Sequence, residues 1–127
     1  MKIDYCEMTK EEIHRELDSF MKRVEVLFDL IKEVRENRSA DSLERLKTEF
    51  LSIKTEIKEH YKVLSSSKTK RNEIVNSYYW PAIQDIYVHI SSLGTNHISF
   101  RSLEKVGSAA YDIRSYARYY QPKEYKE

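Results

Sequence analysis

The residues best suited to chemistry in this chain are histidines that lie close to carboxylates in the sequence. In helical bundles, a di-iron site uses two Glu-x-x-His motifs and two further glutamates that point inward. Glu11 and His14 form one such motif, and the sequence contains no second one. His14 also falls at the expected start of its helix, far from the middle of a bundle. We therefore expect no di-iron centre.

Two other positions leave a metal site open as an alternative. Asp85 and His89 are four residues apart, so on a helix they could share a metal ion or a hydrogen bond. His60 is a polar residue on an apolar helical face. We interpret His60 as a boundary residue, with Tyr61 in the core position, and His89 as a local partner of Asp85. Such spacings are common in proteins without metals, so we assign no metal ligands and no cofactor.

A hydrolase arrangement is the other chemistry that the spacing suggests. Asp85, His89 and Ser92 have the residue types of an orienting acid, a base and a nucleophile on one helical face. A working site also needs an oxyanion hole, usually built from backbone amides in a Gly-rich turn. The chain has only two glycines, which also excludes a Gly-rich phosphate loop. We predict no catalytic residues.

Aromatic and arginine side chains gather in the second half of the chain, which contains eight of the ten tyrosines and the single tryptophan. On a helical wheel, Tyr111, Arg114 and Arg118 fall on one flank of an apolar stripe, and we place Tyr119 on the opposite flank. Tyr, Trp and Arg are the residue types that anchor protein interfaces. The candidate partner-binding residues are Trp80, Tyr87, Tyr111, Arg114, Arg118 and Tyr119.

Three interpretations of these side chains compete. In the first, the tyrosine rings pack in grooves between helices and keep their hydroxyls in water. In the second, they form a protein interface. In the third, they stack on RNA bases while cations contact phosphates. The net charge is −2 for residues 1–64 and +3 for residues 65–127, too small to favour nucleic acid. The phosphate contacts would come from Lys68, Lys70, Arg71, Arg114 and Arg118.

The elements that must position these residues are amphipathic helices, because apolar residues recur three and four positions apart. The first helix is expected at about 10–36, with Thr9 and Glu12 forming a capping box. The second is expected at about 42–64, capped by Asp41 or Ser42. The stripes consist of Ile13, Leu17, Phe20, Val24, Leu27, Ile31 and Val34, then Leu43, Leu46, Phe50, Ile53, Ile57 and Leu64.

A third helix is expected at about 69–93, with Pro81 inside it. Proline lacks an amide hydrogen and crowds the preceding turn, so we expect a kink near Pro81 or a full break there. Gly94 is expected to end this helix in a left-handed conformation, and Thr95–Asn96 to form the following turn.

A fourth helix is expected at about 99–120, and residues 121–127 form a polar tail that we expect to fray. Four helices with short connections favour antiparallel neighbours. We therefore predict that residues 1–127 form one all-α domain, an antiparallel up-down four-helix bundle.

The composition agrees with this architecture and suggests a compartment. Two glycines and two prolines in 127 residues are too few for a strand-rich fold with many turns. The single Cys6 suits a reducing cytosol. No segment approaches the 18 apolar residues of a membrane span, and the N-terminal residues do not resemble a secretory signal. We therefore expect a cytoplasmic protein.

Two groups of helical proteins resemble this chain. Small ribonucleases of the HEPN group are similar in size and helix number, but their active site has an Arg followed, after four to six residues, by a His. No Arg of this sequence has a His at that distance, so kinship would imply an absent nuclease site. Small bacterial immunity proteins against peptide toxins also resemble it, as four-helix bundles with a polar C-terminal tail.

The sequence thus predicts a helical bundle that acts without catalysis by binding a protein, as an adaptor, inhibitor or immunity protein does. A homodimer is a further option for the partner. An RNA-binding or degenerate nuclease-type bundle, or a metal-binding bundle, is the alternative.

Overall fold

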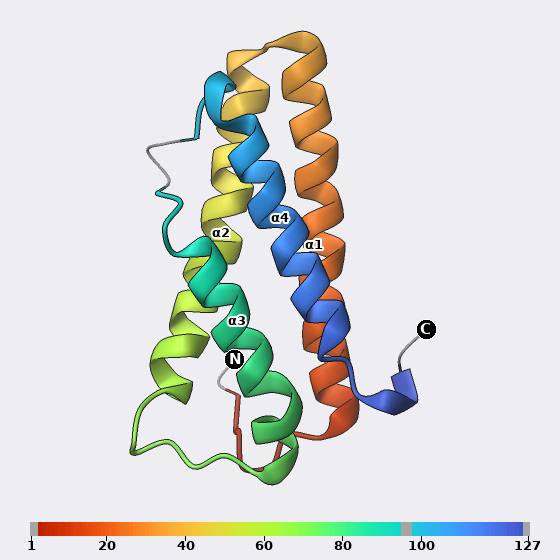
Figure 1. The fold of residues 1–127 in the computed structure, drawn as a ribbon, viewed down its shortest axis with the longest axis vertical. Coiled ribbons are helices and arrows are strands. Elements are labelled where there is room, and N and C mark those ends of the chain that lie inside the picture. The colour runs from red at the N-terminus through yellow and green to blue at the C-terminus, as the bar shows by residue number, and fades with distance from the viewer. Residues whose placement is uncertain (1–2, 95–97, 126–127) are drawn as a thin grey trace.

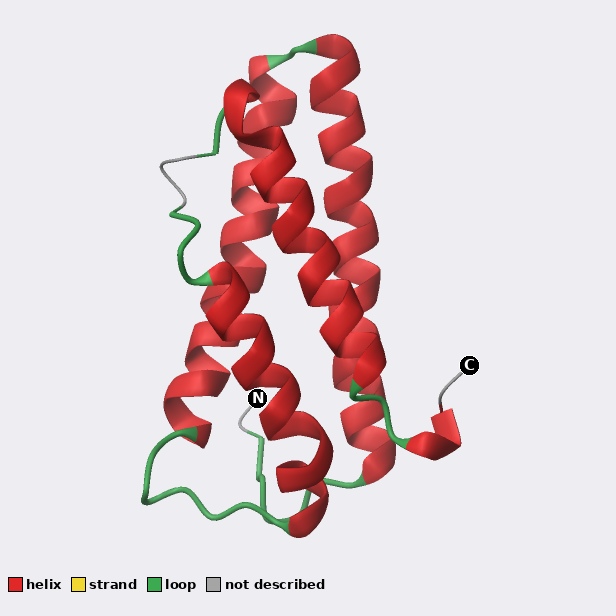
Figure 2. Ribbon diagram, viewed as in Figure 1, coloured by secondary structure: helices red, strands yellow, loops and turns green. Residues whose placement is uncertain are grey.

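The computed structural model describes residues 3–94 and 98–125, and these residues form an up-down bundle of four helices. The helices are α1 (Lys10–Asn37), α2 (Ala40–Leu64), α3 (Trp80–Ile90) and α4 (Leu103–Tyr119). Consecutive helices pack against each other, and α4 returns to pack along α1 (Figure 1). Figure 2 shows helices joined by loops throughout the described chain. The predicted all-α four-helix bundle is confirmed.

The apolar stripes predicted from sequence form the core of this bundle. Every stripe residue of α1 is buried, and in α2 all are buried except Leu43, which is half-buried. Burying one such side chain stabilises the fold by about 1.5–3 kcal/mol. The opposite wall of the core is formed by Val75, Tyr79, Ile83, Ile86, Val106, Ala110, Ile113 and Ala117.

The ends of the first two helices are set by local hydrogen bonds. Thr9 forms the predicted capping box with Glu12: each side chain accepts a hydrogen bond from the backbone amide of the other residue. Arg38 ends α1 in a left-handed conformation, with φ 49°. Ser39 then caps α2 through the amide of Ser42, so α2 begins two residues before the predicted start at 42.

The third helix begins later than predicted, because the residues before it serve other elements. The Thr69 hydroxyl and the Arg71 guanidinium donate hydrogen bonds to carbonyls at the end of α2, those of Val63 and Leu64 respectively. The Asn72 side chain accepts a hydrogen bond from the Val75 amide at 2.8 Å, and helical structure follows from residue 73. The predicted start at Thr69 is therefore wrong.

Pro81 neither breaks the helix nor interrupts its path. The turn before it, Val75–Tyr79, is π-helical and continues directly into α3, with the Trp80 amide donating to the Val75 carbonyl. The wider turn relieves the crowding between a proline ring and the carbonyl four residues earlier. The predicted perturbation near Pro81 therefore takes the form of a π-helical turn.

The end of α3 also differs from its prediction. This helix ends at Ile90 rather than 93, and Leu93 donates a turn hydrogen bond to Ile90. Ser91, in a right-handed helical conformation, caps the helix instead of Gly94, so the predicted left-handed cap at Gly94 is wrong. The predicted turn at Thr95–Asn96 lies outside the described residues. A 3-10 turn, Phe100–Ser102, capped by Ser99, leads into α4.

None of the helices among the described residues is both long and apolar enough to cross a membrane. This result agrees with the absence of a membrane span expected from the sequence.

Candidate functional site

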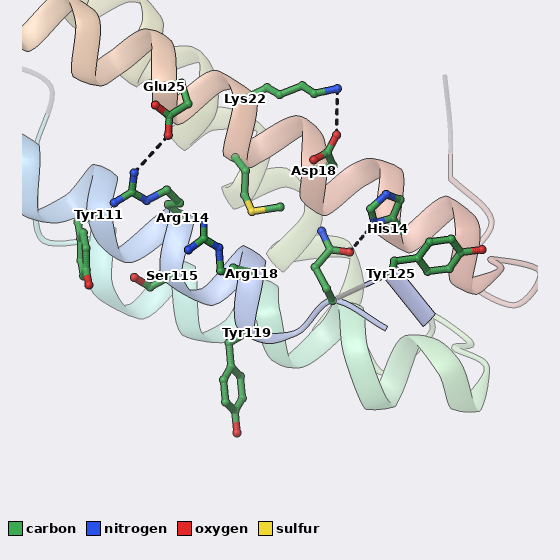
Figure 3. Close-up of a pocket in the computed structure, with 12 residues that line it drawn as sticks. His14, Asp18, Lys22, Glu25, Tyr111, Arg114, Ser115, Arg118, Tyr119 and Tyr125 are labelled. Carbon is green, nitrogen blue, oxygen red and sulfur yellow. Dashed lines mark hydrogen bonds and ion pairs between the residues drawn. The ribbon is translucent and has the colours of Figure 1, made fainter. Parts of the chain in front are cut away.

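A groove of about 610 Å³ runs between α1 and α4. Each helix contributes residues at three- and four-residue spacing, which places them along one flank of the helix. Figure 3 shows Arg114 reaching from α4 to Glu25 on α1, while the rings of Tyr111 and Tyr119 point away from α1. The lining consists of His14, Asp18, Met21, Lys22 and Glu25 from α1, Tyr111, Arg114, Ser115, Arg118 and Tyr119 from α4, and Gln121 and Tyr125.

The structure brings four of the six predicted partner-binding residues to this groove: Tyr111, Arg114, Arg118 and Tyr119. Tyr111 and Tyr119 are 56% and 66% exposed, so more than half of each side chain lies at the surface. Tyr119 was predicted on the opposite flank from Tyr111, and this placement is wrong. Eight residues of α-helix correspond to about 80° of rotation, which leaves both rings on the solvent side of α4.

Trp80 and Tyr87 lie elsewhere, between α2 and α3. Tyr87 stacks on Tyr61 with ring centroids 3.9 Å apart, and Trp80 is tilted against the same ring at 5.4 Å. The Arg71 guanidinium lies over the indole of Trp80. Both predicted residues are half-buried and pack against the core, as the interhelical interpretation of the aromatic residues describes.

The charges along the groove are mostly paired. Arg114 forms an ion pair with Glu25 at 3.2 Å, and Lys22 forms one with Asp18 at 3.0 Å. The Arg114 guanidinium also lies over the ring of Tyr111 at 5.4 Å. Arg118, one turn further along α4, is exposed and has no ion-pair or hydrogen-bond partner for its side chain within residues 3–94 and 98–125. The groove therefore carries one uncompensated positive charge.

The C-terminal segment closes one end of the groove. Gln121 is buried and its side-chain oxygen lies 2.8 Å from Nδ1 of His14, while the Tyr125 ring stacks on the His14 ring at 4.6 Å. Lys10 and Glu124 form an ion pair beside them. Residues of the tail that the sequence predicted to fray, Gln121, Glu124 and Tyr125, thus contact α1 in this structure; residues 126–127 lie outside the described chain.

A second polar site lies where α1 packs on α2. One ligand atom from each of Glu16, Glu56 and His60 falls within 4.8 Å of the other two. The Tyr5 hydroxyl lies 2.7 Å from Nδ1 of His60, and Arg23 forms an ion pair with Glu56. Interactions with His60 first, and then with Arg23, lower the pKa of Glu56 to about 2, against the opposing effect of its burial.

Only part of this second site was predictable from the sequence. His60 was identified as the polar residue on the α2 stripe, but Glu16 and Glu56 were not singled out. The signal available was the four-residue spacing of Glu56 and His60, which places both side chains on one helical face. No sequence signal pairs them with Glu16 or Tyr5, because those contacts depend on how distant segments pack.

Asp85 and His89 do not share a ligand position. His89 Nδ1 lies 2.7 Å from the backbone oxygen of Asp85, while Nε2 contacts the Tyr116 hydroxyl at 3.1 Å. The Asp85 carboxylate instead accepts a hydrogen bond from the Tyr120 hydroxyl. The two side chains therefore bind different neighbours, and Ser92 contacts neither of them through a hydrogen bond in the described part of the chain.

Comparison of the chain with protein-family models, with curated protein sequences and with solved structures gives no match.

Proposed function

We propose that this protein acts without catalysis by binding another protein in the groove between α1 and α4. The observation that carries the proposal is the exposed Arg118 guanidinium, which has no partner for its charge in the described structure and lies among tyrosine rings. Arginine and tyrosine side chains supply much of the binding energy at protein interfaces. A partner that brings a carboxylate to Arg118 and apolar groups to Tyr111 and Tyr119 fits this surface.

The charge pattern favours a protein over RNA. On the α1 wall, Asp18 and Glu25 pair with Lys22 and Arg114, so these two cations are not free to contact a phosphate backbone laid along the groove. Both acids already neutralise cations of the same groove, which leaves Arg118 to bind a single acidic side chain. The cytosol, where the exposed thiol of Cys6 would remain reduced, is the compartment that we propose.

The proposal is tested by affinity capture with the wild-type protein and two charge-reversal variants. Arg118→Glu places a negative charge in the groove. Arg101→Glu is the matched control, because Arg101 is also exposed but lies at the other end of the same helical segment. We expect at least one protein to be retained by the wild type and by Arg101→Glu, and its affinity for Arg118→Glu to fall by about tenfold or more.

Purified components then identify the class of partner. Binding that survives ribonuclease and involves a second polypeptide supports the proposal, whereas capture that ribonuclease abolishes and that weakens steeply with salt indicates RNA. A complex with a second copy of this chain, detected by light scattering, would show that the partner is the protein itself. Equal retention of every captured protein by both variants would contradict the role assigned to the groove.

A further inference from the structure

We propose that Glu16, Glu56 and His60 form a binding site for a first-row divalent metal ion, with Zn²⁺ as the ion that fits their chemistry best. The site lies between α1 and α2, on the other flank of α1 from the partner groove. This inference is independent of the proposed protein binding, because no residue of the metal site lines the groove.

The donor atoms are close enough to share one ion. They lie within 4.8 Å of one another, and Nε2 of His60 is 3.7 Å from Oε1 of Glu56. That distance is too long for a hydrogen bond. It is close to the separation of about 3.4 Å between two atoms that bind one zinc ion tetrahedrally at about 2.0–2.1 Å. Small rotations of the half-buried side chains would bring the donor atoms from their present separations to the distance that a bound ion requires.

Neighbouring residues orient two of the three ligands, His60 and Glu56, as metal sites require. The Tyr5 hydroxyl holds Nδ1 of His60 at 2.7 Å, which leaves Nε2 directed toward Glu56. Arg23 occupies Oε2 of Glu56 and is itself bonded to the Ser52 hydroxyl at 3.0 Å, which leaves Oε1 of Glu56 for an ion. Hydrogen bonds to the remote atoms of ligating histidines and carboxylates are the usual support of a metal site.

A buried hydroxyl without a partner is the independent sign of a ligand. The Tyr79 side chain is 0% exposed, and its hydroxyl has no hydrogen-bond partner within the described residues. Its ring meets the His60 ring edge-on at 5.7 Å. The Tyr79 ring also stacks against the ring of Tyr5, at 6.2 Å between centroids, and the Tyr5 hydroxyl contacts His60. A metal-bound water would supply the missing partner.

The donor set selects the class of ion. Two carboxylates and one imidazole suit Zn²⁺, which commonly takes three protein ligands and one water. Ca²⁺ prefers six to eight oxygen ligands, whereas this group offers one oxygen from each of two carboxylates. Soft thiolate-binding ions are not matched, because Cys6 is exposed and is not one of the grouped ligands. The charges of two glutamates also outweigh that of Arg23, so a cation improves the electrostatic balance.

The test is a calorimetric titration of Zn²⁺ into protein freed of metal with a chelator. We expect one equivalent to bind the wild type. Glu16→Gln removes a ligand whose side chain makes no hydrogen bond within residues 3–94 and 98–125, and it should weaken binding by at least about tenfold. Glu59→Gln, an exposed neighbour on α2, is the matched control and should bind as the wild type does. His89→Gln should also bind one equivalent normally, which would show that the exposed His89 is not a metal ligand.

A spectroscopic measurement keeps the proposal falsifiable if Glu16→Gln fails to fold. In nuclear magnetic resonance spectra of the wild type, Zn²⁺ should shift the ring signals of His60 and leave those of His89 in place. Metal addition should also perturb tyrosine absorption, and Tyr79→Phe should reduce that perturbation. The proposal is overturned if the wild type does not bind one equivalent, if Glu16→Gln and Glu59→Gln bind equally, or if the His60 signals stay unchanged.

Discussion

The two flanks of α1 carry polar side chains in two different settings. On one flank, Asp18, Lys22 and Glu25 line an open groove between α1 and α4 (Figure 3). On the other, Glu16 and Arg23 face α2 and meet Glu56 in a half-buried cluster. The same residue types therefore have different consequences: in the groove, water screens each pair, whereas in the cluster each group depends on its neighbours.

The difference shows how a single helix can serve two sites. The buried stripe of α1 separates the two polar flanks, so the groove and the cluster share a framework but no side chains. Substitutions in the groove should alter partner binding with little effect on stability. In metal-free protein, substitutions in the cluster should alter stability and leave partner binding unchanged. The following substitutions test this contrast.

The largest effect is expected from Phe20, which lies in the core beneath the cluster. Its side chain is 1% exposed, and its ring meets the His60 ring edge-on at 6.5 Å. Phe20→Ala should lower the free energy of unfolding by about 3–5 kcal/mol, because it removes buried area and leaves a cavity. Tyr119→Ala in the groove should change it by less than about 0.5 kcal/mol. Urea unfolding followed by circular dichroism measures both, and equal losses would contradict the contrast.

A smaller difference is expected between the two arginine ion pairs. Glu56, the partner of Arg23, is 36% exposed, whereas Glu25, the partner of Arg114, is 62% exposed. Removing Arg23 deprives a partly buried carboxylate of its donor, so Arg23→Ala should cost about 1–2 kcal/mol of unfolding free energy in metal-free protein. Arg114→Ala should cost about 0.5 kcal/mol. Double-mutant cycles with Glu56→Gln and Glu25→Gln isolate the energy of each ion pair. The Arg23–Glu56 pair should be the stronger of the two, and equal energies would contradict the contrast.

The smallest effect is expected from removing the Tyr79 hydroxyl, in comparison with that of Tyr120. Tyr120 donates a hydrogen bond to Asp85, so Tyr120→Phe should cost about 1 kcal/mol of unfolding free energy. Tyr79→Phe removes a buried hydroxyl that has no partner in the described chain, so in metal-free protein it should be neutral or stabilising. A clear loss of stability in Tyr79→Phe without metal would show that its hydroxyl already has a partner.

The Tyr120 hydrogen bond also predicts a dependence on pH. The bond to Asp85, with smaller effects of burial and nearby charge, raises the pKa of Tyr120 from 10.0 to about 12. Because the folded pKa is the higher one, the bond contributes fully below pH 10 and is lost as the pH rises toward 12. Wild type should therefore lose more unfolding free energy than Tyr120→Phe across this alkaline range. If both proteins lose the same unfolding free energy over that range, as measured by urea denaturation at each pH, the Tyr120–Asp85 hydrogen bond is not the cause of the pH dependence.

Most of the fold was predictable because helix formation is a local matter. The apolar spacing of α1 and α2 and the capping box at Thr9 depend on residues within a few positions of each other, and both are confirmed. The third helix was less predictable. Asn72 is its cap partly because its side chain also binds the carbonyls of Cys6 and Met8, far away in the sequence.

The candidate groove was predictable only in part. The types of Tyr111, Arg114 and Arg118 indicated an exposed flank of α4, and the structure places them together. Trp80 has the same interface-forming character, yet it packs against Tyr61. Composition and spacing cannot distinguish these outcomes, because they do not show which neighbouring helix covers which flank.

By itself, the sequence determined that the chain forms amphipathic helices with one apolar side each, because the 3.6-residue period of the helix converts spacing into a face. Only the tertiary structure decided which polar residues meet. Tyr5, Glu16, His60 and Tyr79 come from four separate segments. Their convergence depends on the rotation of α1 against α2 and on the π-helical turn before Pro81, which no local pattern specifies.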